Sequence, residues 1–300
     1  RPNQFCNLTE IVVRAGDTIN TLTRKIKVAT LLGTIQSTFT NFGYLRKVWQ
    51  DNTEEERLLG VSLTGIMDSE LLNGKESGLA KTLETLKKVA VECNKEYAEK
   101  FNINQSTAIT CVKPSGTVSQ LVDSASGIHA RHNPYYIRTV RGDNKDPLTE
   151  FLKASGIPSE PDVMKPDHTT VFSFPMMAPK GSVCRTDMTA IQQLEIWKTY
   201  AKHWCEHKPS VTISVKEDEW VPVGAWCWEN FEYLSGVSFL PFSDHTYQQA
   251  PYQDIDEDTY KKLVKAMPKE IDWKNLQDFE KEDNTKGSQE LACTAGVCEL

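Results

Sequence analysis

Helix-like and strand-like segments alternate along most of this 300-residue chain, and this order restricts its fold more than any other feature. Each long amphipathic stretch is followed by a short β-branched or apolar run; the pairs are 17–40 with 59–66, 76–101 with 106–112, and 187–207 with 210–215. Strands joined through helices are parallel and are covered by those helices. The sequence therefore predicts an α/β architecture, with largely parallel strands in a sheet or a barrel.

Two further helices and the two ends of the chain complete this prediction. Carboxylates at 52–56 indicate a helix start, and a helix at 223–234 is expected before the strand 237–241. The chain begins without Met in a strand-like run at 10–14, as expected of a chain cut inside a fold. From about residue 270 the sequence is highly charged, so we expect one domain over 1–269 and a mobile tail over 270–300.

The charge and hydropathy of the chain exclude two classes of partner. The formal net charge is −7, whereas broad contact with a nucleic-acid backbone needs clustered Lys and Arg. No apolar run reaches the roughly 20 residues that cross a bilayer, and the N-terminus lacks a signal-peptide layout. We therefore expect no nucleic acid, no membrane and a cytoplasmic location.

A turn between a predicted strand and a helix-like continuation indicates an anion site. The turn follows the strand 106–112 and consists of Pro114, Ser115, Gly116, Thr117 and Val118. Glycine permits close approach of a ligand, the hydroxyls donate hydrogen bonds, and helix amides lack internal acceptors. The alternative is a plain tight turn, and the Gly-x-x-x-x-Gly-Lys pattern of nucleoside triphosphatases is absent.

Three of the eight cysteines stand out by their position. Cys293 and Cys298 lie near the C-terminus, where the predicted tail offers no core, so a reversible dithiol is expected there. Half of a zinc site and a pair without function are the alternatives, and since no second pair of ligands lies nearby we expect no metal. Cys6 precedes the first strand, where a lone cysteine is usually structural. The 203–207 segment, with two histidines and a cysteine, is also expected to be structural.

In this order, the motifs resemble the catalytic chain of ribonucleotide reductases. The family shows a Cys-Asn-Leu segment with one redox thiol, a Pro-Ser/Thr-Gly-Ser/Thr loop for the substrate phosphates and often a terminal cysteine pair. Cys6, the turn at 114–118, and the pair Cys293 and Cys298 match these features. Stretches at 59–65, 129–138 and 236–241 also look like the cobalamin-dependent, single-chain triphosphate reductases. The resemblance implies the C-terminal half of a ten-stranded α/β barrel of the ribonucleotide reductase type.

The resemblance also implies a reaction and its participants. In the family a thiyl radical abstracts the ribose 3′ hydrogen, water leaves from C2′, and a dithiol that includes the equivalent of Cys6 supplies the reducing equivalents. The tail pair Cys293 and Cys298 would then exchange with the resulting disulfide and be reduced by thioredoxin. The family's Asn-x-Cys-x-Glu segment, its second redox cysteine and its effector region lie upstream. This chain lacks them, so it is expected to need the N-terminal half of the reductase.

Adenosylcobalamin is the radical source that the resemblance favours. Diiron-dependent relatives carry an adjacent tyrosine pair late in the barrel, but Tyr135 and Tyr136 come soon after the phosphate loop and are expected to serve packing or loop structure. Glycyl-radical relatives have a different C-terminal context. The residues that contact cobalamin, and the choice between diphosphate and triphosphate, stay open. Three alternatives remain: a diiron-dependent reductase, another radical enzyme on the same barrel, and a non-catalytic redox or nucleotide-binding module.

Overall fold

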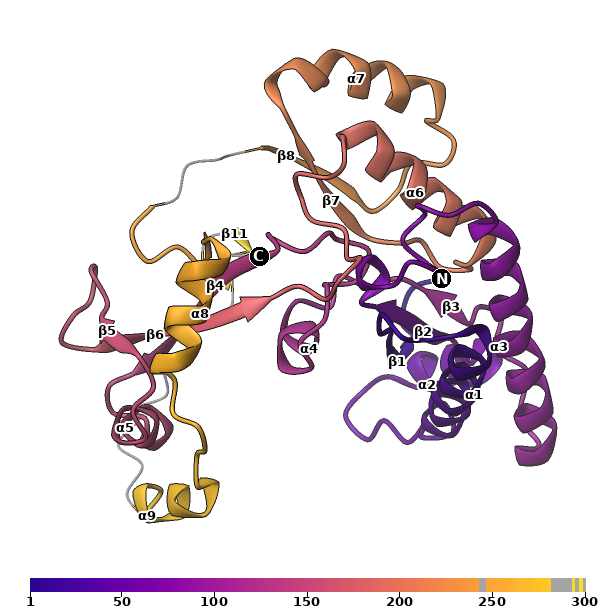
Figure 1. The fold of residues 1–300 in the computed structure, drawn as a ribbon. Helices are drawn as coiled ribbons and strands as arrows, with labels where there is room; N and C mark the ends of the chain where they lie inside the picture. The colour runs from indigo at the N-terminus through magenta and orange to yellow at the C-terminus, as the bar shows by residue number, and fades with distance from the viewer. Residues whose placement is uncertain (243–246, 282–292, 295–296, 299–300) are drawn as a thin grey trace. The chain divides into compact units, whose positions relative to one another are not determined.

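The computed structural model describes residues 1–242 and 247–281, and the backbone of 293–294 and 297–298 (Figure 1). The chain divides into two compact units. The first contains residues 1–131 and 179–242, and the second contains 132–178 and 243–300. The mixed α/β class predicted from the order of segments is confirmed.

Parallel strands form the centre of the first unit. β1 (Asn7–Val12), β2 (Leu59–Thr64) and β3 (Thr110–Cys111) make one sheet in that order, and β7 (Val211–Val215) pairs with β8 (Val237–Pro241) in another. The Ser210 amide donates to the Val112 carbonyl at 3.1 Å, so the segment entering β7 continues beside the end of β3. β3 is shorter than the predicted strand at 106–112.

Long helices cover one face of these strands (Figure 1). They are α1 (Ile19–Gln36), α3 (Leu79–Phe101) and α6 (Ala190–His203). The Thr18 hydroxyl accepts from the amide of Thr21 and starts α1, as the sequence predicts. Gly33 of α1 lies against Leu59 and Thr9, which places that side of the sheet toward the helix. Apolar side chains between the layers form the core, among them Leu22, Ile26, Leu59, Val61, Leu63, Leu86, Trp197 and Trp204.

The shorter helices of this unit connect the strands, and one prediction about them was wrong. They are α2 (Lys47–Glu56), the 3-10 turn η1 (Ile66–Asp68), α4 (Gly116–Leu121), η2 (Glu217–Glu219) and α7 (Trp220–Glu229). The 52–56 segment, expected to start a helix, instead ends α2, and Arg57 closes it in the left-handed conformation. The Glu54 carboxylate accepts from Thr40 and Gln50, so side-chain contacts outweigh its unfavourable place near the helix C-terminus.

The second unit is built around an antiparallel sheet that the alternation of helices and strands did not predict. Its order is β5 (Ser159–Pro161), β6 (Thr169–Met177), β4 (Tyr135–Asp143) and β9 (Tyr252–Asp254). α5 (Pro147–Ala154) and α8 (Glu257–Ala266) accompany it. Tyr135 and Tyr136, expected to serve packing or loop structure, lie in β4; Tyr136 is buried, and its ring contacts Tyr252.

Part of the predicted tail is packed. η3 (Trp273–Asn275) and α9 (Leu276–Phe279) follow residue 270, and the rings of Trp273 and Phe279 pack on Phe151 of α5. Beyond residue 281, only the backbones of β10 (Cys293–Thr294) and β11 (Val297–Cys298) are described. A division into a barrel over 1–269 and a tail over 270–300 stays a prediction. Among the described residues, no helix combines the length and the apolarity that spanning a membrane requires.

A buried ion pair fixes the loops that follow β2 and α4. The Arg131 guanidinium donates to both carboxylate oxygens of Asp68 at 2.8 Å, and both side chains are at most 3% exposed. Asp68 also accepts from the Ala125 amide, and Arg131 reaches Asp123 at the end of α4. Burial of two charges is favourable only with such complete pairing.

Replacing Arg131 by Met should therefore lower the free energy of unfolding by about 3–5 kcal/mol, because Asp68 would stay buried without its cation. Urea titrations followed by tryptophan fluorescence measure this, since Trp197 and Trp204 lie in the core of the same unit. Lys100→Met is the control, because Lys100 pairs with Glu96 on an exposed helix face and its loss should be undetectable. Equal effects of the two substitutions would contradict the assignment.

Candidate functional site

The strand register gathers polar side chains on the face of the first sheet that points away from α1. Leu8 is opposite Gly60, while Glu10, Ser62 and Cys111 are level with one another on β1, β2 and β3. Because side chains alternate along a strand, all five positions share one face. Leu8 is 50% exposed, so this face is open to solvent over β1 in the described part of the chain.

Gly60 brings two thiols together at the centre of this face. A Cβ atom at Gly60 would lie 3.0 Å from the Cys6 sulfur, 3.4 Å from the Cys111 sulfur and only 2.3 Å from Leu8. A Cβ atom would therefore force Leu8 to move and would press on the Cys6 sulfur, while its contact with Cys111 would be ordinary. Close approach of neighbouring groups is one of the reasons for glycine inside a strand.

His207 lies beside the sulfur of Cys6. Its Nε2 is 2.7 Å from the Leu59 carbonyl oxygen and 3.9 Å from the Cys6 sulfur. A carbonyl oxygen only accepts, so Nε2 carries the proton in this arrangement. This single N–H is directed at the Leu59 carbonyl, so His207 contacts the Cys6 sulfur at 3.9 Å without serving as its base. The predicted helix at 187–207 ends early, because α6 stops at His203 and His207 lies beyond it, within reach of Cys6. The structural role expected for the 203–207 segment stays a prediction.

Burial keeps both thiols protonated, and one lysine opposes this effect. Burial raises the pKa of Cys6, while the Lys113 ammonium lowers it. Burial raises the pKa of Cys111 to about 12, with Lys113 again lowering it and Cys6 raising it. Since the thiolate is the nucleophile in exchange, Cys6 is the more reactive of the two.

Cys6 and Cys111 do not form a disulfide in this arrangement. β2 runs between their strands, so their backbones are two inter-strand spacings apart, about 10 Å, which exceeds the roughly 7 Å that a disulfide can bridge. Both are free thiols, as are the other four cysteines outside the C-terminal pair. A redox partner for Cys6 would have to approach over the open face.

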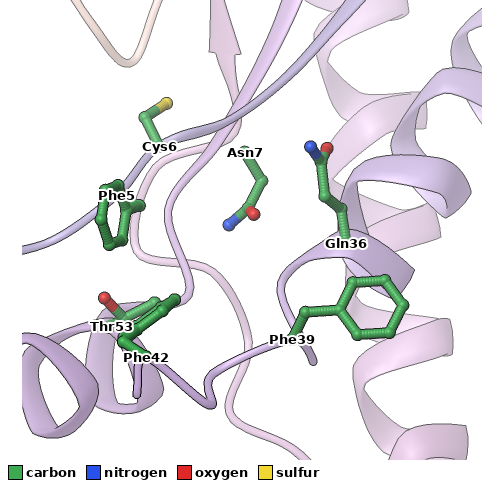
Figure 2. A pocket seen from close by; sticks show the side chains of 7 residues that line it. All are labelled: Phe5, Cys6, Asn7, Gln36, Phe39, Phe42 and Thr53. Carbon is green, nitrogen blue, oxygen red and sulfur yellow. The ribbon is translucent and has the colours of Figure 1, made fainter. Parts of the chain in front are cut away.

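An apolar pocket of about 390 Å³ borders Cys6 on the side of α1 and α2 (Figure 2). Phe5 packs on Phe42 with ring centroids 4.9 Å apart, and Asn7 and Gln36 supply amides to the lining. In Figure 2 the sulfur of Cys6 points away from the phenylalanine rings. Cys6 thus lines the pocket while its sulfur is directed toward Gly60.

The predicted phosphate loop follows β3 directly and leads into the short helix α4. The Lys113 amide donates to the Ser62 hydroxyl at 2.9 Å, which fixes the start of the loop to β2. Ser115 has φ +53°, in the left-handed region, so the strained residue is Ser115 and not the glycine that follows it. A non-glycine residue in this region costs about 1 kcal/mol or more and persists only where neighbouring contacts impose it.

β1 and the residue Arg14 shortly after it hold the two ends of this loop-and-helix segment. The Ser115 hydroxyl donates to the Glu10 carboxylate at 2.6 Å. The Arg14 guanidinium donates to the carbonyls of Val122 and Asp123, just after α4, at 2.6 and 2.7 Å. Burial raises the pKa of Glu10, and the bond from Ser115 lowers it. The strand that begins after Cys6 therefore positions the loop.

The structure thus brings two of the three predicted groups of site residues onto one unit. Cys6 and Glu10 are four residues apart, or roughly 13 Å along an extended chain, and Glu10 contacts the loop. The third group lies in the second unit, where the backbones of Cys293 and Cys298 are antiparallel partners. Their side chains lie outside the described part of the chain. Sequence reasoning missed Glu10, Cys111, Lys113 and His207; strand alternation pointed to Glu10 and Cys111, but nothing local pointed to His207.

Comparisons with known proteins agree with the resemblance drawn from the motifs. The chain is 30% identical over 290 residues to a probable adenosylcobalamin-dependent ribonucleoside-triphosphate reductase of Dictyostelium discoideum, covering 91% of the chain and 36% of that protein. It is 25% identical over 274 residues to an adenosylcobalamin-dependent ribonucleoside-triphosphate reductase of Lactobacillus gasseri, covering 82% of the chain and 37% of that protein. The chain therefore spans little more than a third of the length of these relatives. No family model matches it.

A solved structure shares the fold. The crystal structure of a B12-dependent, class II ribonucleotide reductase superposes with a TM-score of 0.79 over 94% of this chain and 43% of that one, at 23% identity. The predicted resemblance to cobalamin-dependent reductases is confirmed by these relatives, and none of the relatives described here is named as diiron-dependent.

Replacing Lys113 by Met should slow alkylation of Cys6, because the ammonium that lowers the pKa of this thiol is lost. The midpoint of its pH profile should move to higher pH, and the rate of reaction with iodoacetamide at about pH 8 should fall severalfold. Peptide mass spectrometry measures each cysteine separately, and Cys227, whose pKa is raised by burial alone, serves as the internal reference. Lys88→Met, on an exposed face of α3, is the matched control. An unchanged profile for Cys6 would show that Lys113 does not act on it.

Proposed function

We propose that this chain forms part of an adenosylcobalamin-dependent reductase that converts ribonucleoside triphosphates to 2′-deoxyribonucleotides. The observation that supports this most is the single sheet face that carries the Cys6 thiol and, through Glu10, reaches the loop at 114–118. The named relatives, which match most of the chain, support the same reaction and cofactor.

Cys6 is proposed to supply one of the two reducing equivalents. Removal of water from C2′ and return of a hydrogen to that carbon consumes two electrons, which two thiols provide as they become a disulfide. Burial keeps Cys6 protonated, and the His207 ring, held by its bond to the Leu59 carbonyl, lies 3.9 Å from the sulfur. The second thiol of this pair is proposed to come from another part of the reductase, since β2 separates Cys111 from Cys6.

Pro114, Ser115, Gly116, Thr117 and Val118 are proposed to hold the substrate phosphates. The hydroxyls of Ser115 and Thr117 are donors in this loop, and Thr117 and Val118 are exposed to solvent. The roughly 13 Å from Glu10 back to Cys6 leaves room for a ribose between the loop and the thiol. A triphosphate substrate is proposed in preference to a diphosphate because the relatives are named ribonucleoside-triphosphate reductases.

Other parts of the reductase are proposed to complete the site. The strands β1, β2, β3, β7 and β8 are proposed as one half of a ten-stranded barrel, with the other half contributing the thiyl-forming cysteine, a proton-transferring glutamate and the effector site. Adenosylcobalamin supplies the initial radical when it is bound, and none of the described residues is assigned to hold it. The residues of this chain act on the substrate and on the disulfide.

The terminal pair Cys293 and Cys298 is proposed to regenerate the active-site dithiol. An internal disulfide beneath a bound substrate is poorly accessible to an external protein, whereas a tethered dithiol has a high effective concentration. Thioredoxin or a similar reductant would then reduce the tail. Free thiols at the six other cysteines fit a reducing compartment, and we propose that the protein acts in the cytoplasm.

A chimera tests the reductase proposal. This chain would replace the matching segment of the Lactobacillus gasseri reductase, and deoxynucleotide formation from a ribonucleoside triphosphate would be measured with adenosylcobalamin and a dithiol. We expect Cys6→Ser to abolish multiple turnover, because the disulfide cannot form. Cys227→Ser, on α7, should retain activity. Equal activity of the two variants would contradict the role of Cys6.

The role of the tail is tested in the same chimera with two reductants. The double variant Cys293→Ser, Cys298→Ser should lose nearly all turnover with thioredoxin and keep most of it with dithiothreitol, because a small dithiol reaches the site without a relay. The variant Ser288→Ala in the same segment is the control. Equal loss with both reductants would exclude a shuttle, and no loss with thioredoxin would show that the protein reductant acts on the site directly.

A further inference from the structure

The carboxylate of Glu10 has an unusual set of partners for a charged group. It is half-buried on β1 and accepts one hydrogen bond, from the Ser115 hydroxyl at 2.6 Å. Within the described part of the chain, no lysine, arginine or histidine lies within ion-pair distance of it. A carboxylate oriented at the loop proposed to bind phosphate would repel that ligand, so its presence there needs an explanation.

None of the charged groups around Glu10 in the described part of the chain forms an ion pair with it. On β1 and α1, Arg14 binds the carbonyls of Val122 and Asp123, and Lys25 binds Asp17 and the Val12 carbonyl. Arg24 of α1 lines the surface groove next to β1 together with Glu10. On β3 and its loop, Cys111 is neutral, and Lys113 acts on the two thiols. Ser115 is thus the partner on which the state of Glu10 depends.

The number of protons in the Glu10–Ser115 pair determines what Ser115 offers to a ligand. A serine hydroxyl has one proton to donate, and the ionised carboxylate has none. With Glu10 ionised, that single proton is used on the carboxylate. With Glu10 protonated, the carboxylic O–H donates to the Ser115 oxygen, and the serine proton is free to point at a phosphate oxygen. One added proton therefore removes a repulsive charge and releases a donor.

We propose that Glu10 takes up a proton from solvent when a polyphosphate binds at the loop, so that Ser115 changes from a donor to Glu10 into a donor to the ligand. This inference rests on the proposed role of residues 114–118 in holding phosphates. No covalent bond changes; a solvent proton moves onto the Glu10 carboxylate, and the hydrogen bond between the two side chains reverses its direction. The 2.6 Å contact between the Ser115 hydroxyl and the Glu10 carboxylate is short enough for a hydrogen bond in either direction.

Proton uptake on binding predicts that the affinity for phosphate rises as pH falls. Burial already raises the pKa of Glu10, and a neighbouring anion raises it further. Binding then strengthens as pH falls through the interval between the pKa of the free and the bound protein, by at most about tenfold per pH unit for one proton. Above this interval, binding is weakened by the repelling carboxylate.

The experiment compares wild-type chain with Glu10→Gln. Inorganic tripolyphosphate is the probe, and isothermal titration calorimetry in buffers of different ionisation enthalpy gives both affinity and protons taken up. The glutamine amide is neutral and donates to the Ser115 oxygen, so it imitates the protonated carboxyl. At about pH 8, Glu10→Gln should bind roughly tenfold more tightly than wild type, and at about pH 5 the two should converge. On binding tripolyphosphate, the wild type should take up as much as one proton more per ligand than Glu10→Gln does.

Tripolyphosphate itself releases or binds protons when it binds. This contribution is the same for wild type and Glu10→Gln, so the difference in proton uptake between the two proteins reports on Glu10 alone. Gly116→Val is the control for the loop. It should weaken tripolyphosphate binding when introduced into wild type and when introduced into Glu10→Gln. Circular dichroism confirms that each variant is folded. Glu10→Ala removes the charge without supplying a donor and should regain only part of the affinity that glutamine gives.

Two failures are distinguishable. If tripolyphosphate binds, Gly116→Val weakens it, and Glu10→Gln has the same affinity and proton uptake as wild type, then the role of Glu10 is wrong while the phosphate loop stands. If neither protein binds, or binding is indifferent to Gly116→Val, then the loop itself is not a phosphate site and the inference fails with it. Binding by Glu10→Gln alone at about pH 8 would support both.

Discussion

The parallel register of β1, β2 and β3 decides which side chains share a face, and the rest of the site depends on it. Glu10, Ser62 and Cys111 are level across three strands, while Leu59, Val61 and Leu63 point into the helices. Burial of those three leucine and valine side chains contributes roughly 1.5–3 kcal/mol each, so the apolar face holds the register firmly. The orientation of the polar face follows from this packing, and its own hydrogen bonds fix the loop after β3.

This division lets the open face carry groups that a core would not tolerate. Cys6 is half-buried beside the His207 ring, Glu10 has one hydroxyl partner, and Gly60 leaves space between two sulfurs. Each of these features is unfavourable or neutral for folding. Their positions are maintained by helix packing on the opposite side and by the ion pair of Arg131 with Asp68 behind the loop.

Much of the first unit follows from periodicity alone. The apolar run at β2 and the amphipathic pattern of α3 predict both elements, because each has a single face to bury. The antiparallel unit was not predicted, since residues 144–168 separate β4 from β6 and neither strand carries a tight-turn signal. The helix start expected at 52–56 was wrong because Glu54 is held by contacts with Thr40 and Gln50 that spacing does not reveal.

The site was predictable in its local motifs and not in its long-range contacts. The loop after β3 and Cys6 before β1 could be named from neighbouring residues. His207 could not, because it comes 201 positions after Cys6 and its contact depends on where α6 ends. Glu10 lay in an apparent strand with no motif, and only the register shows that it faces the loop.

Cys6 lies just before β1, Glu10 lies within it and Arg14 lies just after it, at intervals of four residues. The geometry of the site therefore depends on the alternation of side chains along this one strand. An insertion or deletion of a single residue between Cys6 and Glu10 would turn one of them toward α1, whatever side chain it introduced. Substitutions in this segment alter individual contacts, whereas a change in its length would separate the thiol from the loop altogether. Divergence in this part of the chain is therefore restricted to replacement at constant length.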